Sequence, residues 1–171
     1  MPDHHLDTSE VEPYRNRLSG IAFTTEIARK PPSFERRLIP SLLRNSALCF
    51  GCGPQNEAGL QLEFQMLDDG RLETRFRPRA IHGGWEGIFH GGLMATLLDE
   101  AMLAHLYLRN VNATTAALEV RFAAEVRLGD ELLVHAWESS RRGRLHTMEA
   151  TARRGDTIVA RALAKCLTGK E

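Results

Sequence analysis

The sequence has no excess of charge of either sign and no long hydrophobic run. Its 171 residues include 22 Lys and Arg and 22 Asp and Glu, so the formal net charge is zero. A chain without net charge has no global field that attracts nucleic acid or an anionic membrane surface. No segment reaches the ~18 consecutive apolar residues of a transmembrane helix, and the first residues lack the basic start and apolar centre of a secretory signal. These absences predict a cytoplasmic protein that acts on small molecules, with neither nucleic acid nor membrane as a partner.

Cysteine is scarce, with Cys49, Cys52 and Cys166 in the whole chain. An odd number of cysteines in a chain without an export signal argues against a disulfide framework. Cys49 and Cys52 have the Cys-x-x-Cys spacing that is found in zinc and redox sites. A zinc ion normally takes four ligands, however, and the chain has no second cysteine pair. We therefore expect a buried turn of small residues here, with no metal and no cofactor, and a core position for Cys166.

The sequence divides into an N-terminal extension over residues 1–45 and a domain over residues 46–171. The extension begins with a polar, acidic stretch without periodicity, which is typical of a flexible terminus. Pro31-Pro32 then interrupts the chain, and Ser33 is a suitable N-cap for a short helix over residues 33–44. Three roles are compatible with this extension: a lid, a packing arm or an oligomer contact.

Turn residues and alternating side chains predict six strands and one long helix in the domain. Apolar and polar residues alternate over residues 60–65 and 71–77, and Asp68-Asp69-Gly70 between them is a hairpin turn. A glycine-rich loop follows over residues 78–89, and then a helix from residue 91 to about residue 109. Glycine-containing turns separate the other expected strands, which span residues 114–126, 131–140, 144–153 and 157–167.

The predicted helix is apolar on nearly all sides, because Asp99, Glu100 and His105 are its only ionisable residues between Leu93 and Leu108. A helix without a broad solvent face has to be covered nearly all round. One sheet of about six antiparallel strands can curl around such a helix, but it covers only one side. The expected fold class is therefore α+β, and the uncovered side predicts a dimer formed through the helix or the neighbouring sheet edge.

Two glycines, Gly91 and Gly92, follow His90 at the start of this helix. A helix start exposes unpaired backbone N–H groups and the positive end of the helix dipole. A residue without a side chain lets another group approach those N–H groups closely. Asp99 lies eight residues after Gly91 in the apolar run, and a carboxylate in such surroundings is a candidate functional group.

These residues are part of a longer series of motifs. The series consists of Cys49-Phe50-Gly51-Cys52-Gly53-Pro54 with Asn56 and Gly59-Leu60, then His82 and Gly87, then His90-Gly91-Gly92 with Asp99, and then Thr115 to Phe122. On these motifs the chain resembles the hot-dog-fold thioesterase superfamily, in particular its phenylacetate-pathway and 4-hydroxybenzoyl-CoA thioesterase-like branch. The resemblance covers roughly residues 46–168 and departs at Asn56-Glu57, where the family often has Asn-Pro. It implies a curled six-stranded antiparallel sheet wrapped around one central helix, and an acyl-CoA thioesterase that uses no cofactor.

Thioester hydrolysis needs a donor for the developing oxyanion and a base or a nucleophile. We predict the Gly91 N–H as the donor, with Gly92 either assisting or permitting tight packing. Asp99 either activates water or attacks the thioester to form an anhydride. The resemblance implies that Thr115 orients the carboxylate or the water, whereas His90 is expected to hold the turn through hydrogen bonds.

Glu100 is the rival acid. Adjacent helix positions point about 100° apart, so only one of the two carboxylates faces the site, and we favour Asp99.

Gly91 and Asp99 are about 12 Å apart along one helix, at 1.5 Å per residue, which is too far for both to touch one carbonyl group. Two copies packed antiparallel about a twofold axis bring the start of one helix beside the middle of the other. We therefore predict a homodimer with two sites, each combining Gly91 of one subunit with Asp99 of its neighbour, and we leave open whether dimers pair into a homotetramer.

Coenzyme A would bring phosphates to the site, and Arg141, Arg142 and Arg144 form the densest basic cluster, so we expect this turn at the pyrophosphate or the 3′-phosphate. The expected acyl pocket runs along the helix and is lined by Leu93, Met94, Leu97 and Met102, with His82 and Trp85 in the loop above. Two alternatives stay open. One is a non-catalytic acyl-CoA or lipid-binding protein. The other is an enoyl-thioester hydratase, which is disfavoured because His105 and Asp99 lie on different helix faces.

Overall fold

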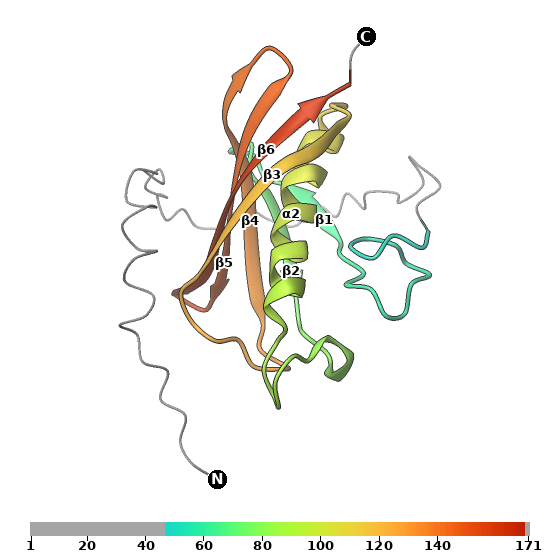
Figure 1. The fold of residues 1–171 in the computed structure, drawn as a ribbon, viewed down its shortest axis with the longest axis vertical. Coiled ribbons are helices and arrows are strands. Elements are labelled where there is room, and N and C mark those ends of the chain that lie inside the picture. Colours follow the sequence, from blue (N-terminus) through green and yellow to red (C-terminus); the bar gives the residue numbers. More distant parts are fainter. Residues whose placement is uncertain (1–46, 170–171) are drawn as a thin grey trace. The chain divides into compact units, whose positions relative to one another are not determined.

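The computed structural model describes residues 47–169, which form one six-stranded sheet and one long helix (Figure 1). A single turn of 3-10 helix, η3 (Ala80–His82), precedes the long helix α2 (Gly91–Leu108). The strands are β1 (Phe64–Met66), β2 (Leu72–Phe76), β3 (Ala113–Phe122), β4 (Leu132–Arg142), β5 (Leu145–Arg154) and β6 (Thr157–Thr168). The short helix expected over residues 33–44 lies outside the described residues.

The sheet is antiparallel throughout, with the strand order β1-β2-β4-β5-β6-β3. Tight turns join β4 to β5 and β5 to β6, and Gly143 and Gly155 in these turns have φ values of 57° and 55°, where glycine is the least strained residue. β3 follows the helix and pairs with β6, so it forms one edge of the sheet. The predicted α+β class, with two strands, a helix and then four strands, is confirmed.

The sheet curls around one side of α2 (Figure 1), and small side chains on its inner face let the helix pack closely. Ala136, Ala150 and Ala162 are paired across β4, β5 and β6, and each is fully buried. On the helix, the large side chains of Leu97, Leu98 and Met102 are also fully buried. Large residues from the helix therefore meet alanines from the strands, which is how an interior reaches its usual packing density.

The side of α2 next to β3 is less well covered. Leu118 and Phe122 on β3 are 38% and 58% exposed. On the helix, Leu93, Thr96 and Leu103 are half-buried. The helix therefore has a mainly apolar stripe that its own sheet does not cover, as the sequence predicted. β3 beside it has a free edge whose backbone groups have no strand partner among the described residues.

Two predicted strand boundaries were wrong. Leu60 and Leu62 alternate as in a strand, but their N–H groups donate to Phe50 O and Gly51 O in the preceding loop, at 2.8 and 3.0 Å. Gln61 between them has a φ of 52°, which interrupts extended backbone, so β1 starts only at Phe64. β3 ends at Phe122 instead of residue 126, because Ala123 N donates to Val159 O outside the regular ladder.

In the described part of the chain, no helix is long and apolar enough to span a membrane.

Candidate active site

The start of α2 is closed by the side chain of His90. His90 is the N-cap residue, and its Nδ1 accepts a hydrogen bond of 2.9 Å from Gly92 N. The His90 N–H donates in turn to the carbonyl oxygen of His82 at 3.0 Å. An N-cap bond of this kind satisfies one of the N–H groups that a helix start leaves unpaired. His90 therefore holds the turn, and the Gly92 N–H is already occupied.

The Gly91 N–H, in contrast, has no acceptor among the described residues, and Gly91 is exposed. The two glycines also differ in the space around them. A Cβ on Gly92 would lie 2.9 Å from His90 Cε1, so the His90 cap requires glycine there. A Cβ on Gly91 would lie at an ordinary 3.7 Å from the Phe122 ring. Glycine at position 91 is therefore not required by packing within the chain, and its bare backbone N–H is open to a group from outside.

Asp99 is half-buried in the middle of α2 and is held by Thr115 on β3. The Thr115 hydroxyl donates a hydrogen bond of 2.6 Å to Asp99 Oδ1. The β3–β6 register shifts between Thr115 and Ala117, so Ala116 is an extra residue in β3. Such a bulge redirects side chains at a strand edge, and here Thr115 is directed toward the helix. The structure thus brings together the two residues that the sequence placed sixteen positions apart.

Burial raises the pKa of the Asp99 carboxyl above its usual range, while the Thr115 hydrogen bond acts in the opposite direction. Among the described residues, no basic side chain forms an ion pair with Asp99. A carboxylate whose charge is only partly stabilised is a stronger base and a better nucleophile than one held by a salt bridge. This electrostatic setting suits either role predicted for Asp99.

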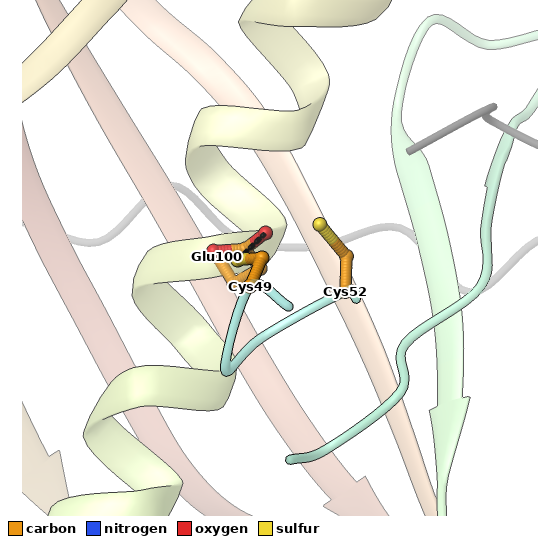
Figure 2. A group of neighbouring side chains, drawn as sticks. All are labelled: Cys49, Cys52 and Glu100. Atoms are coloured by element: carbon orange, nitrogen blue, oxygen red, sulfur yellow. Dashed lines mark hydrogen bonds between the residues drawn. The ribbon is translucent and has the colours of Figure 1, made fainter. Parts of the chain in front are cut away.

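Glu100 faces a different neighbour. Its carboxylate lies beside the loop that contains Cys49 and Cys52 (Figure 2), and Cys49 Sγ donates to Glu100 Oε1 at 3.9 Å. Burial raises the pKa of Glu100, and burial together with Glu100 raises the pKa of Cys52. The two adjacent acids therefore belong to separate clusters. No spacing rule indicates this contact, because Cys52 and Glu100 are 48 positions apart in the sequence.

The residues predicted to contact the acyl group lie in different surroundings. Trp85 is 78% exposed and Leu93 is half-buried, whereas Met94, Leu97 and Met102 are buried. His82 is fully buried, with its ring 5.3 Å from that of Phe76 and its Nδ1 accepting from Arg79 N at 3.1 Å. Through its carbonyl bond to His90 it supports the turn, and its direct contact with a substrate stays a prediction.

The arginine turn lies at the opposite end of β3 from Gly91. Arg144 donates to Thr168 O at 3.2 Å, and Thr168 pairs with Ala113 at the start of β3, whereas Gly91 lies beside Phe122 at its end. These two ends are about 30 Å apart at 3.3 Å per residue. Figure 1 shows the β4–β5 hairpin and the start of α2 at opposite ends of the sheet. Asp99, bonded to Thr115, is closer to the arginine end.

An antiparallel sheet curled around one long helix is the hot-dog fold. Residues 86–161, which contain α2 and β3 to β5, match the profile of the thioesterase superfamily. No curated protein matches the chain significantly.

Solved structures of similar fold include several thioesterase-superfamily proteins. One is a putative thioesterase from Ralstonia eutropha, a phenylacetic acid degradation-related protein, with 21% identity and a TM-score of 0.57 over 64% of this chain and 86% of that chain. Another is zebrafish thioesterase superfamily member 2, with 16% identity and a TM-score of 0.60 over 69% and 92%. At these low identities, the structural similarity shows a shared fold and nothing further.

A third similar structure is a hypothetical thioesterase from Streptococcus pneumoniae in complex with coenzyme A. It has 15% identity and a TM-score of 0.60 over 64% of this chain and 90% of that chain. The Streptococcus pneumoniae protein has also been solved with one aspartate replaced by alanine, and separately with a threonine sixteen positions later replaced by alanine.

Proposed function

We propose that this protein is an acyl-CoA thioesterase that hydrolyses an acyl or aryl thioester to the free acid and the thiol. The observation that carries this proposal is the Asp99–Thr115 hydrogen bond in the middle of α2, together with the unpaired Gly91 N–H at its start. These are the base or nucleophile and the oxyanion donor that the reaction needs. The alanine variants of the Streptococcus pneumoniae protein add support, because Asp99 and Thr115 have the same residue types and spacing.

The proposed site combines two subunits. Gly91 and Asp99 are about 12 Å apart along one helix axis, so one chain does not bring both to one carbonyl group. The apolar stripe of α2 and the free edge of β3 lie side by side, and no strand or helix among residues 47–169 covers them. A twofold dimer that pairs two β3 edges would cover both features and place Gly91 of each subunit near Asp99 of the other.

In the proposed reaction, the thioester carbonyl oxygen accepts the Gly91 N–H of one subunit. Asp99 of the other subunit takes a proton from a water molecule, and the water oxygen forms a bond to the carbonyl carbon. The carbonyl electron pair moves to oxygen, where the N–H and the helix dipole stabilise it. When the pair returns, the carbon–sulfur bond breaks, and the proton that Asp99 took from water passes to the departing sulfur, which leaves as the thiol. In the alternative route, an Asp99 carboxylate oxygen attacks the carbon itself, the carbon–sulfur bond breaks and the thiolate leaves, which gives an anhydride. Water then hydrolyses this anhydride to the free acid and restores the Asp99 carboxylate.

The coenzyme A moiety is assigned to the arginine turn of the subunit that supplies Asp99. Arg144 and Asp99 both lie near the beginning of β3, through Thr168 and Thr115 respectively. In an antiparallel dimer, this end of β3 faces the Gly91 end of the partner strand. Arginine pairs well with phosphate oxygens, and the similar Streptococcus pneumoniae protein binds coenzyme A. Leu93 and Trp85 are suitably exposed to contact the acyl group.

A thiol-release assay over aliphatic and aromatic acyl-CoAs tests this proposal. Asp99→Asn removes the base and the nucleophile at nearly constant shape, so kcat is expected to fall by about 10²–10⁴-fold. Asp156→Asn is the matched control, because Asp156 is an exposed carboxylate in the β5–β6 turn. An unchanged rate in Asp99→Asn would remove Asp99 from the mechanism. Tight binding of acyl-CoA without turnover of any substrate would instead identify a binding protein.

Hydration of an enoyl thioester receives no support from the geometry. That reaction requires a histidine and an acid in one site. His105 is buried, and its Nε2 lies 2.9 Å from Gly70 O in the β1–β2 turn. Its ring therefore faces away from the Asp99–Thr115 pair.

A further inference from the structure

A second cluster of reactive side chains lies outside the proposed active site. It consists of the thiols of Cys49 and Cys52 and the carboxylate of Glu100, and we call it the Cys–Cys–Glu cluster (Figure 2). One ligand atom from each residue lies within 4.8 Å of the other two. The proposed hydrolysis uses none of these groups, so the cluster needs a separate explanation.

Backbone hydrogen bonds fix the loop that carries the two thiols. Gly53 N donates to Cys49 O at 2.9 Å, which closes the Cys-x-x-Cys turn. Leu60 N and Leu62 N donate to Phe50 O and Gly51 O, the two residues between the cysteines. The loop is therefore a defined structure with both thiols on the side that faces α2, and Glu100 extends from the helix to meet them (Figure 2).

Two glycines make this close approach possible. A Cβ on Gly51 would lie 2.5 Å from Glu100 Cδ, and a Cβ on Gly53 would lie 2.4 Å from Cys49 N. Both distances are shorter than real Cβ contacts, so a side chain at position 51 would displace the Glu100 carboxylate and one at position 53 would collide with the backbone of Cys49. A ligand set that is held together by backbone in this way loses little conformational entropy when an ion binds.

All three groups are acids, and the described residues provide no basic side chain that pairs with Glu100. Reactive redox cysteines lie in electropositive surroundings, whereas these thiols lie beside a carboxylate. Thiolate and carboxylate oxygen are both ligands of Zn²⁺, which also accepts sites with three protein ligands and a water molecule. Cys49 and Cys52 are only half-buried, so water can reach the fourth position.

We propose that Cys49, Cys52 and Glu100 bind a Zn²⁺ ion that fastens the loop of residues 49–53 to the middle of α2. The sequence predicted no metal because the cysteine pair has no second pair, and the fold supplies Glu100 as the third ligand. Binding forms two Zn–S bonds and one Zn–O bond, and the thiol protons are released to solvent. The ion supplies the positive charge that the cluster lacks, and this role does not depend on the proposed hydrolysis.

Metal analysis of the full-length protein tests this inference. The protein is purified under reducing conditions, stripped with a chelator, and titrated with Zn²⁺ or Co²⁺. We expect about one ion per chain, and a near-ultraviolet thiolate-to-Co²⁺ charge-transfer band that reports sulfur ligation. Cys52→Ser should abolish the band and the tight binding, and Glu100→Gln should weaken Zn²⁺ binding at least tenfold. Cys166→Ala is the control, because it removes a thiol outside the cluster and should leave the stoichiometry unchanged.

The stability of the wild-type protein provides a second readout, should a variant fail to fold. Zn²⁺ that binds the native state raises Tm with concentration, and we expect this rise in the wild type and in Cys166→Ala but not in Cys52→Ser. Absence of Zn²⁺ and of the Co²⁺ band in the reduced, folded wild type would overturn the proposal. A Cys49–Cys52 disulfide in protein that takes up no metal would also overturn it and would indicate a redox role.

Discussion

The hydroxyl group of Thr115 on β3 donates a hydrogen bond of 2.6 Å to Asp99 in the middle of α2. This bond fixes the direction of one carboxylate oxygen, so the other oxygen, Oδ2, is left for water or a thioester. It also favours the charged form of the carboxyl group, against the effect of burial. A β-bulge is what directs Thr115 toward the helix.

Replacement of Thr115 should therefore lower activity without removing the reactive group. In Thr115→Val the shape is kept and the hydrogen bond is lost, so we expect kcat/KM to fall about 10–100-fold, as for the loss of a hydrogen bond to a charged group. Thr115→Ser restores a hydroxyl group and should recover most of the activity. Thiol release and circular dichroism on the three proteins check this, and equal activity in Thr115→Val would show that the bond is only structural.

The two glycines at the start of α2 should respond differently to a methyl group. Alanine at position 92 would collide with the His90 ring, so Gly92→Ala should displace the N-cap and lower the free energy of unfolding by about 0.5–2 kcal/mol. Alanine at position 91 has space within the chain, so Gly91→Ala should keep the stability of the wild type. Its methyl group would hinder the approach of a carbonyl oxygen, and kcat should fall.

Urea unfolding and thiol release, measured on both variants, separate these effects. A loss of stability in Gly91→Ala with unchanged kcat would contradict the assignment of the oxyanion donor.

Part of this architecture was predictable because it depends on local chemistry. Capping by His90, the apolar face of α2 and the turn at Gly143 are set by neighbouring residues, and so the helix and the order of strands followed from the sequence. The strand predicted over Leu60 and Leu62 is absent, because these residues bury their side chains while their backbone N–H groups donate to a loop. Alternation of apolar and polar residues predicts which side chains are buried. It does not predict which segment accepts the backbone hydrogen bonds.

The contacts of Asp99 and Glu100 show the same limit at the level of the site. Helix periodicity predicted that the two acids face different directions. The fold determines which residue each acid contacts. A bulge in β3 brings Thr115 to Asp99, and the loop of residues 49–53 brings Cys49 to Glu100. Both contacts join segments far apart in the chain. The resemblance indicated the role of Thr115 beside Asp99, whereas nothing in the sequence indicated the contact between Cys49 and Glu100.

A buried pair of residues on neighbouring strands, Glu73 on β2 and His135 on β4, should make the stability of the fold depend on pH. His135 Nε2 donates to Glu73 Oε2 at 3.0 Å, both residues are buried, and this bond lowers the pKa of Glu73. A carboxyl group whose pKa is lower in the folded state stabilises the fold above its unfolded pKa, near 4.5, and loses this contribution as the pH falls through the folded pKa. Glu73→Gln should therefore cost about 1–3 kcal/mol at pH 7, and this cost should decrease progressively as the pH falls below about 4.5.

Urea unfolding at a series of pH values measures this difference. Glu131→Gln is the matched control: Glu131 also forms ion pairs, with Arg75 and Arg77, but its side chain is 56% exposed. Exposed pairs contribute only about 0–1 kcal/mol, so this variant should differ little from the wild type at any pH. A pH-independent cost in Glu73→Gln would show that the loss comes from packing.

Mixing two inactive variants tests whether each site draws on both subunits. One variant carries Asp99→Asn and the other carries Gly91→Val, which blocks the helix start. Each homodimer lacks a complete site. In a heterodimer, Gly91 of the first chain meets Asp99 of the second, so one of the two sites is intact and the other carries both defects. Co-expressed chains with two different affinity tags allow the heterodimer to be isolated, and we expect about half of the wild-type activity per dimer. If both residues acted within one chain, each subunit of the heterodimer would still hold one defect, and no activity would return.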